Sequence, residues 1–258
     1  MDVIIFSGQS NMQGQSECLS ECNIVKNAYE YRYLTDEAVP LKNPVGESIT
    51  YEWKRGYDPT PETEPHGWLA THVTGSACYG HTNLVPAFCR TWTELTGRET
   101  LAVHVAKGST VIANWLPGSP GYEIIRQKSR RAIQKVHSDR IVFVWLQGES
   151  DALAGTTKEA YKNSLRTLCD ALKRDVGIDL FGIIRVGRFA NDDRDLEILA
   201  AQDEVCREYE DFAMLTDIAT TLNTQSEYMH PRIKGHYSAK GLEALGEAAA
   251  RGLYKQFS

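Results

Sequence analysis

Short apolar segments alternate with helical patterns along most of the chain, and this alternation restricts the fold more than any other feature. Five runs are rich in β-branched residues and nearly all apolar, as buried parallel strands are: residues 3–6, 101–105, 141–146, 180–186 and 212–215. Helical patterns cover residues 83–95, 122–136, 158–174, 196–209 and 239–254. Strands that alternate with helices form a parallel sheet covered on both faces. We therefore predict an α/β fold with a central parallel sheet of about five strands.

One segment, residues 28–80, breaks the alternation. Its first part, "AYEYRYLTDEAVPL", predicts a β-hairpin with its turn near Asp36. The Pro-rich part that follows is irregular, and loops of this length are often functional. Its aromatic residues are Tyr51, Trp53, Tyr57 and Trp68. They either form a wall on which a sugar stacks or pack the loop onto the domain. We expect a single domain over residues 1–258 that carries this segment as an insertion.

The composition excludes several classes of protein. The chain has 258 residues, of which 42% are hydrophobic, and a formal net charge of −6, so it can bury a large core and has no basic surface for nucleic acid. No apolar run approaches the roughly 20 residues that span a bilayer, and the N-terminal run is too short for a signal peptide. The six cysteines lack zinc-site spacing. We expect a cytoplasmic protein with free thiols and no metal, membrane or nucleic-acid partner.

Small polar residues follow the first three predicted strands. Ser10 follows the first strand, Gly108 the second and Gln147 the third. Ligand sites of open parallel sheets form beyond the carboxyl ends of the strands, so these residues should meet. A serine, a glycine N–H and a side-chain amide suit acyl transfer, in which N–H donors stabilise a developing oxyanion. The best-placed general base is His236 in "GHYSAKG", before the last helix, and His230 is its rival.

Four blocks of the sequence resemble a known family. "GQSNMQG", "AKGSTVIANW", "WLQGESDA" and "HYSAKGLEALG" are similar to the conserved blocks of the SGNH (GDSL-like) hydrolases, and within them to the sialate O-acetylesterase domain, or carbohydrate esterase family six. The similarity runs from residue 3 to about residue 250. It implies a three-layer α/β/α flavodoxin-like fold and hydrolysis of acetyl esters on carbohydrates without a cofactor.

The resemblance also implies roles for individual residues. Ser10 would be the nucleophile and His236 the base. The oxyanion hole would consist of the N–H groups of Ser10 and Gly108 and the side chain of Gln147, where other SGNH enzymes carry an asparagine.

The acid of the catalytic triad departs from the family pattern. Many members carry Asp three residues before the histidine, and here that residue is Ile233. Some family-six esterases draw the acid from the QGES block, which points to Glu149. We therefore predict a Ser10–His236–Glu149 triad; the alternatives are a backbone carbonyl as the group that orients His236, or a different histidine.

Other polar and aromatic residues near these blocks have two interpretations each. Gln9 and Asn11 either bind substrate or hold the turn around Ser10 by local hydrogen bonds. Trp115 and Trp68 are candidates for the wall of a substrate pocket, although Trp115 also suits the core. Ser150 is interpreted as the N-cap of the helix at residues 158–174.

These observations predict a serine esterase that acts on small acetylated carbohydrates, such as acetylated xylo-oligosaccharides or sialic acid, through an acyl-enzyme intermediate. One alternative is a non-catalytic carbohydrate-binding protein on the same fold, which the absence of Asp at position 233 favours. The other is an O-acetyltransferase, which would need a second acceptor site. Hydrolysis of p-nitrophenyl acetate separates the esterase from the binding protein.

Overall fold

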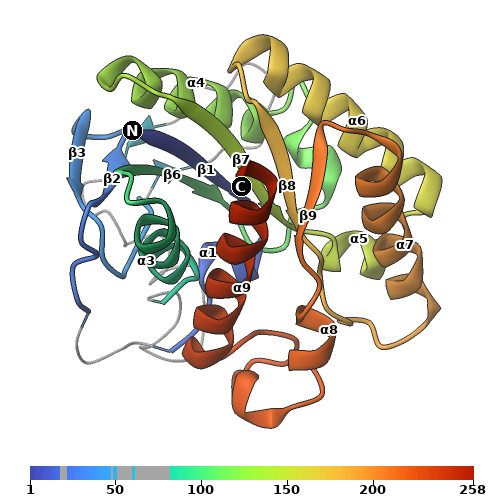
Figure 1. Ribbon diagram of the computed structural model, residues 1–258. Coiled ribbons are helices and arrows are strands. Elements are labelled where there is room, and N and C mark those ends of the chain that lie inside the picture. The colour runs from blue at the N-terminus through green and yellow to red at the C-terminus, as the bar shows by residue number, and fades with distance from the viewer. Residues whose placement is uncertain (18–21, 48, 51–59, 62–81) are drawn as a thin grey trace.

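The centre of the protein is a seven-stranded sheet with the strand order β3-β2-β6-β1-β7-β8-β9 (Figure 1). The computed structural model describes residues 1–17, 22–47, 49–50, 60–61 and 82–258. The strands are β1 (Asp2–Gly8), β2 (Ala28–Arg32), β3 (Glu37–Pro40), β6 (Thr100–Ala106), β7 (Arg140–Leu146), β8 (Leu180–Ile184) and β9 (Phe212–Thr216). Only β3 is antiparallel to its neighbour. A separate two-stranded sheet pairs β4 (Ile49–Thr50) with β5 (Thr60–Pro61).

The predicted parallel sheet is confirmed, but it is wider than about five strands. Each of the five predicted apolar runs contributes a strand, namely β1, β6, β7, β8 and β9, although the run at residues 180–186 extends beyond the end of β8 at Ile184. The predicted hairpin is also confirmed, and its strand β2 pairs in parallel with β6, which extends the sheet by β2 and β3. The aromatic residues predicted to follow the hairpin, Tyr51, Trp53, Tyr57 and Trp68, lie outside the described residues.

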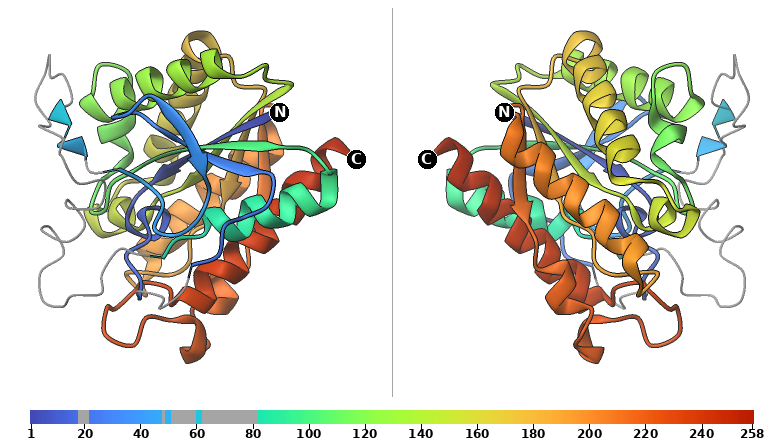
Figure 2. Two further views of the ribbon diagram at one scale, coloured as in Figure 1. Left: turned by 90° about the vertical axis from the view of Figure 1, so that its left-hand side faces the viewer. Right: turned by 90° about the vertical axis from the view of Figure 1, so that its right-hand side faces the viewer.

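Helices cover both faces of the sheet, as the three-layer prediction requires (Figure 2). One face carries α3 (Val85–Thr96) and α9 (Ala239–Phe257), which pack against each other. The other face carries α4 (Pro120–Lys135) and α6 (Lys158–Asp175), and α7 (Asp193–Glu208) packs beside α6. The short helices are α1 (Ser10–Gln13), α5 (Glu149–Ala154), α8 (Ala219–Leu222) and the 3₁₀ turns η1 (Ile112–Trp115) and η2 (Ser226–Tyr228).

Side-chain caps fix where the long helices begin. The side-chain oxygens of Ser119, Thr157 and Ser238 accept backbone N–H groups in the first turns of α4, α6 and α9, which satisfies donors that a helix leaves unpaired. The prediction that Ser150 caps α6 is wrong. Thr157 is the cap, and Ser150 lies inside the separate helix α5.

The register of the central strands brings three loops to one edge of the sheet. Gly8, the last residue of β1, is opposite both Ala106 of β6 and Leu146 of β7. The chain leaves β1 with β6 on one side and β7 on the other, so the carboxyl end of β1 lies at the point where the strand order reverses. Ligands of open α/β sheets bind at such a point.

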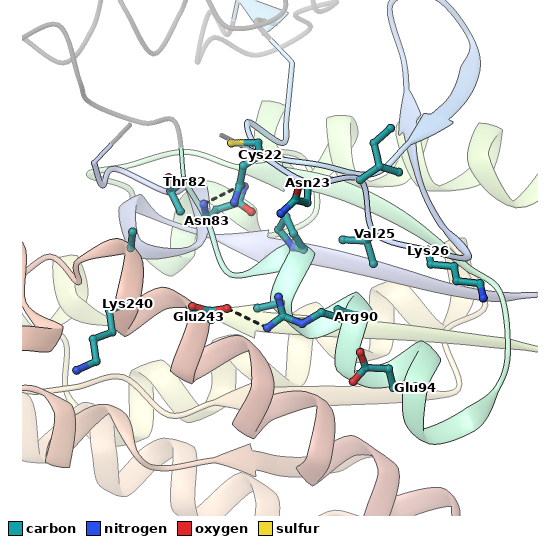
Figure 3. Close-up of a pocket in the computed structure, with 15 residues that line it drawn as sticks. Cys22, Asn23, Val25, Lys26, Thr82, Asn83, Arg90, Glu94, Lys240 and Glu243 are labelled. Carbon is teal, nitrogen blue, oxygen red and sulfur yellow. Dashed lines mark hydrogen bonds and ion pairs between the residues drawn. The ribbon is translucent and has the colours of Figure 1, made fainter. Parts of the chain in front are cut away.

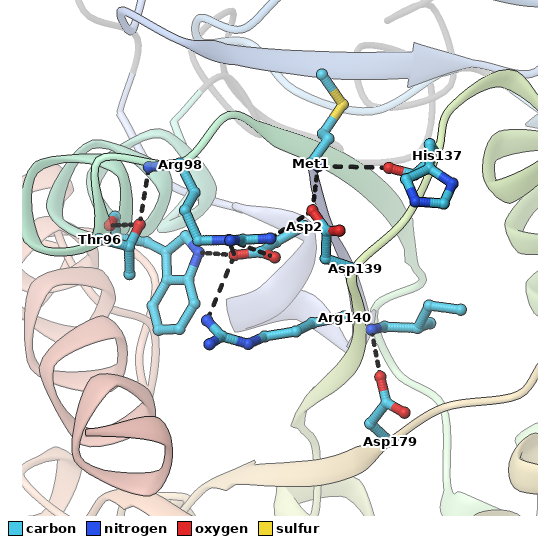
Figure 4. Close-up of polar contacts among 10 residues, drawn as sticks. Met1, Asp2, Thr96, Arg98, His137, Asp139, Arg140 and Asp179 are labelled. Carbon is cyan, nitrogen blue, oxygen red and sulfur yellow. Dashed lines mark hydrogen bonds and ion pairs between the residues drawn. The ribbon is translucent and has the colours of Figure 1, made fainter.

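The opposite end of β1 is a structural anchor (Figure 4). The buried carboxylate of Asp2 accepts the Trp92 indole N–H at 3.0 Å and the Arg98 Nε–H at 3.0 Å, and Arg140 lies 3.8 Å away. Seven residues of strand separate this network from Ser10, or about 20 Å. It fixes the first strand and lies remote from the loops at the carboxyl edge.

Among the described helices, none has an apolar stretch long enough to cross a bilayer. Cys22, Cys89, Cys169 and Cys206 are free thiols, which confirms that part of the prediction for them. Cys18 and Cys78 lie outside the described residues.

Candidate active site

Ser10 begins α1 directly after the central strand. The N–H of Gln9 donates to Leu146 O at 3.1 Å, and the N–H groups of Gly14 and Gln15 donate to Ser10 O at 2.9 and 3.1 Å. These bonds hold a tight turn in which only 5% of Ser10 is exposed. As the first helical residue, Ser10 has a backbone N–H with no acceptor inside the helix.

Gly108 lies against Ser10, as predicted from the sequence. The N–H of Lys107 donates to Gly8 O at 3.0 Å, which aligns the loop after β6 with the turn after β1. A Cβ atom added to Gly108 would lie only 3.2 Å from Ser10 Cβ, so glycine permits this close approach. The Gly108 N–H donates to Oε1 of Gln13 at 2.7 Å.

The side-chain amide of Gln147 is bonded to groups other than those of the predicted oxyanion hole. Its Nε2 donates to Thr110 O at 2.9 Å and to Asp151 Oδ2 at 2.5 Å, and its Oε1 accepts the Tyr161 hydroxyl at 2.9 Å. A side-chain amide has two N–H groups, and both are used here. The fully buried Gln147 therefore fixes Asp151 and the loop after β6, and has no N–H left for an oxyanion.

The hydrogen bonds of Glu149 also differ from those expected of the acid in the predicted triad. Its carboxylate accepts Gln9 Nε2 at 2.6 Å and Asn11 Nδ2 at 2.8 Å, and no hydrogen bond joins it to His236 among the described residues. Burial raises the pKa of Glu149, and the bonds from Asn11 and Gln9 act in the opposite direction. Glu149 thus fixes the two residues on either side of Ser10.

The other candidate binding residues have mainly structural contacts. Oε1 of Gln9 accepts the Ser150 hydroxyl at 2.5 Å, so both ends of this buried side chain hold the turn. Trp115 is fully buried and packs edge-on against Trp145 with ring centroids 6.0 Å apart, which places it in the core rather than in a pocket wall. Trp68 lies outside the described residues.

His236 has the geometry of a neutral base. Its Nδ1 lies 3.0 Å from the carbonyl oxygen of Lys234, and since a carbonyl only accepts, this nitrogen carries the hydrogen. Its Nε2 therefore has the free lone pair, and this buried atom has no hydrogen-bond partner among the described residues. Burial lowers the pKa of His236, which favours the neutral ring. The ring of Phe189 lies edge-on at 6.1 Å.

His230, the rival base, is bound to its own turn. Its Nδ1 accepts the N–H groups of Arg232 at 3.1 Å and Ile233 at 2.9 Å. The backbone N–H of His230 donates to His236 O at 2.8 Å. His230 therefore shapes the loop that presents His236.

Asn11 connects the turn of Ser10 to the loop of His236. Its Oδ1 accepts the Tyr237 N–H at 3.2 Å, and its Nδ2 lies 3.4 Å from Gly235 O. Asn11 therefore contacts the residues on both sides of His236. Sequence reasoning missed this role, because no local pattern reveals a contact between residues so far apart.

The cavity in Figure 3 is separate from the candidate active-site residues described above. It measures about 700 Å³ and is lined by residues of α3, of α9 and of the segment 22–26, with an Arg90–Glu243 ion pair of 2.9 Å in its wall. None of the described candidate residues lies in its lining.

Solved structures with the same fold include esterases. A protein from Arabidopsis thaliana has a TM-score of 0.69 at 16% identity, covering 100% of this chain and 99% of its own. NanS has a TM-score of 0.71 at 12% identity, covering 99% and 97%. A carbohydrate acetylesterase from Xanthomonas citri has a TM-score of 0.55 at 14% identity, covering 98% of this chain and 57% of its own. The TM-scores show that this chain shares the fold of these three structures.

The sequence itself gives the family. No curated protein sequence matches the chain. The family model described as "Carbohydrate esterase, sialic acid-specific acetylesterase" matches residues 1–255, and this confirms the resemblance of the four sequence blocks. The chain belongs to this family of carbohydrate esterases.

Proposed function

We propose that the protein is a serine esterase that removes O-acetyl groups from small carbohydrates. The main support is the state of His236: one ring nitrogen is fixed by a backbone carbonyl, and the other is buried and without a partner among the described residues. Asn11, the neighbour of Ser10, contacts both residues that flank this histidine. The Asn11 side chain thereby joins the turn of the proposed nucleophile to the loop of the proposed base.

In the first half-reaction, Ser10 Oγ attacks the acetyl carbonyl carbon and its proton passes to Nε2 of His236. The C–O electron pair moves onto the carbonyl oxygen, which becomes an oxyanion held by backbone N–H donors. The tetrahedral intermediate then collapses. The sugar oxygen leaves and takes the proton from His236, and the acetyl group remains on Ser10.

In the second half-reaction, water replaces the sugar. His236 removes a proton from the water as it attacks the acetyl-serine, and a second oxyanion forms at the same place. Collapse breaks the Ser10–acetyl bond, His236 returns its proton to Ser10 Oγ, and acetic acid leaves and ionises to acetate in solution. Atoms and charges balance without a metal or other cofactor.

The Lys234 carbonyl takes the orienting role of the missing acid. A triad acid holds the tautomer and stabilises the imidazolium that forms. The carbonyl accepts the Nδ1 hydrogen and so holds the same tautomer, but it carries no full charge. Ser10 and His236 therefore act as a dyad, and Glu149 supports the turn that carries the nucleophile.

The test compares Ser10→Ala and His236→Ala with the exposed control Asn163→Ala, using p-nitrophenyl acetate and acetylated xylo-oligosaccharides or sialic acid. We expect kcat/KM to fall by at least about 10³-fold in both catalytic variants, with unchanged thermal unfolding. Mass spectrometry should detect acetyl-Ser10 in a rapidly quenched wild-type reaction. Full activity of Ser10→Ala would overturn the proposal. A wild type that binds sugar without hydrolysis would indicate the binding protein, and acetyl transfer to a second sugar in preference to water would indicate a transferase.

A further inference from the structure

A carbonyl oxygen of the protein itself accepts two N–H donors beside Ser10. Oε1 of Gln13 accepts the backbone N–H of Gly108 at 2.7 Å and Nε2 of Gln15 at 3.2 Å. The orientation of both amides is forced. A backbone N–H only donates, so Gln13 must face it with oxygen, and Gln15 must then face that oxygen with nitrogen.

These contacts lie next to the nucleophile. Ser10 and Gln13 are three residues apart on α1, so their side chains share a face of the helix. A Cβ atom added to Gly108 would lie 3.1 Å from Gln13 Oε1 and 2.5 Å from Gln15 Nε2, in addition to its close approach to Ser10 Cβ. The two side-chain amides and Ser10 therefore meet around Gly108, where the absence of a side chain leaves room for them.

An oxyanion hole has this arrangement of groups. Two N–H donors converge on an sp² oxygen close to the serine, and the oxygen of an ester carbonyl is the substrate group that would take that place. Gln147, the side-chain donor predicted from the sequence, has both of its N–H groups in use elsewhere. Gln15 is half-exposed, and its only described side-chain hydrogen bond is the one to Gln13.

We propose that Gln15 is a side-chain donor of the oxyanion hole and that the carboxamide of Gln13 occupies this hole when no substrate is bound. The inference rests on the proposed serine mechanism. The ester carbonyl oxygen displaces Gln13 Oε1 and takes over the bonds from Gly108 and Gln15. These bonds strengthen as negative charge develops, because charge-assisted hydrogen bonds are about twice as strong as neutral ones.

The two glutamines should then give effects of opposite sign. Gln13→Ala removes the occupant, and we expect kcat/KM to rise about threefold to tenfold, the equivalent of one net hydrogen bond. Gln15→Ala removes a donor, and we expect kcat to fall about 10²-fold with little change in KM. Gln13→Glu keeps an acceptor oxygen and adds a charge, so it should bind the donors more tightly and lower kcat/KM below the wild-type value. Gln225→Ala, at an exposed glutamine, is the matched control.

A second readout does not depend on turnover. An aryl trifluoromethyl ketone forms a hemiketal oxyanion with a reactive serine, so its Ki should fall in Gln13→Ala and rise in Gln15→Ala. The Gly108 amide signal in ¹H–¹⁵N spectra should move in Gln13→Ala, because its acceptor is lost. Gln15→Ala should keep the wild-type thermal midpoint, whereas Gln13→Ala should unfold at a somewhat lower temperature, because it leaves the buried Gly108 N–H without its acceptor.

Failure of the inference is distinct from failure of the proposed function. A fully active Ser10→Ala variant overturns the serine mechanism. If Ser10→Ala is inactive but Gln13→Ala is no faster than wild type, only the inference is wrong. Loss of activity in both Gln13→Ala and Gln15→Ala, with both variants folded at the assay temperature, would also overturn it, since both side chains would then merely support the turn.

Discussion

Asn11 and Tyr237 are joined by a hydrogen bond of 3.2 Å across 226 residues of sequence. The acceptor follows the proposed nucleophile, and the donor follows the proposed base. Glu149 holds the other end of the Asn11 side chain at 2.8 Å. Asn11 and the buried Glu149 therefore help to set the distance between Ser10 and His236, together with the Ser16 hydroxyl, which donates to Tyr237 O at 3.1 Å.

Asn11→Ala should lower kcat by about 10- to 100-fold, because a displacement of about 1 Å in a catalytic group can cost that much. KM should change little, since Asn11 is buried below the turn. Steady-state kinetics measure the effect, and Asn163→Ala in α6 is the control. A variant with wild-type kcat would show that the His236 loop keeps its position without this bond.

Gly235→Ala should be severely impaired, whereas Lys234→Ala should keep near-wild-type activity. Gly235 has a φ of +77°, and an added Cβ would lie 2.1 Å from the Phe189 ring. The loop must therefore move and carry His236 with it. Lys234 contributes its backbone carbonyl, which alanine retains. Kinetics of the two variants decide this, and strong loss in Lys234→Ala would contradict the carbonyl as orienting group.

Glu149→Gln should destabilise the protein and leave the titration of His236 nearly unchanged. The carboxylate accepts two amide N–H groups, whereas glutamine offers one oxygen and leaves a buried donor facing another donor, at a cost of about 1–3 kcal/mol. Chemical denaturation measures the stability, and NMR titration measures the pKa of His236. A large shift of that pKa would support direct pairing between Glu149 and His236.

The pH dependence of kcat/KM should have its acid limb below the ordinary histidine pKa of about 6.5. Burial lowers the pKa of His236, so the ring stays neutral and can accept the Ser10 proton at pH values where an exposed histidine is charged. A pH–rate profile with p-nitrophenyl acetate measures this limb. A limb above 6.5 would indicate a negatively charged partner for the ring.

Another histidine should govern part of the acid stability. His104 on β6 is buried with Nε2 3.0 Å from Met12 O, and burial lowers its pKa to about 4. Between pH 6.5 and 4 the unfolded chain binds a proton that the folded protein does not, so roughly 3 kcal/mol of stability is lost as the pH falls. His104→Gln should lack this loss in denaturation curves across that range. Glu30, whose pKa burial raises to about 7, titrates in both proteins and cancels in the difference.

The sequence predicted features that depend on local patterns. Apolar runs identified the central strands, and the turn after the run at residues 3–6 made Ser10 the candidate nucleophile, which remains a prediction. The roles of Glu149 and Gln147 depend on hydrogen bonds with residues far away in the sequence, and no local sequence pattern indicates which partners these side chains have. The sequence analysis did not select Gln13 and Gln15, because nothing in the sequence distinguishes them from other glutamines near a turn. Their contacts with each other and with Gly108 appear only in the folded structure.

The central position of β1 also has a consequence for synthesis of the chain. Gly8 pairs with Ala106 and with Leu146, so the strand before Ser10 leaves the ribosome long before either of its partner strands. At about 5–20 residues per second, it waits on the order of 5–20 s for the first of them. During that time its apolar side chains are exposed and can associate with other nascent chains. The rate of translation and the availability of chaperones should therefore affect the yield of active protein, because β1 is exposed during synthesis although every residue of it is buried in the folded protein.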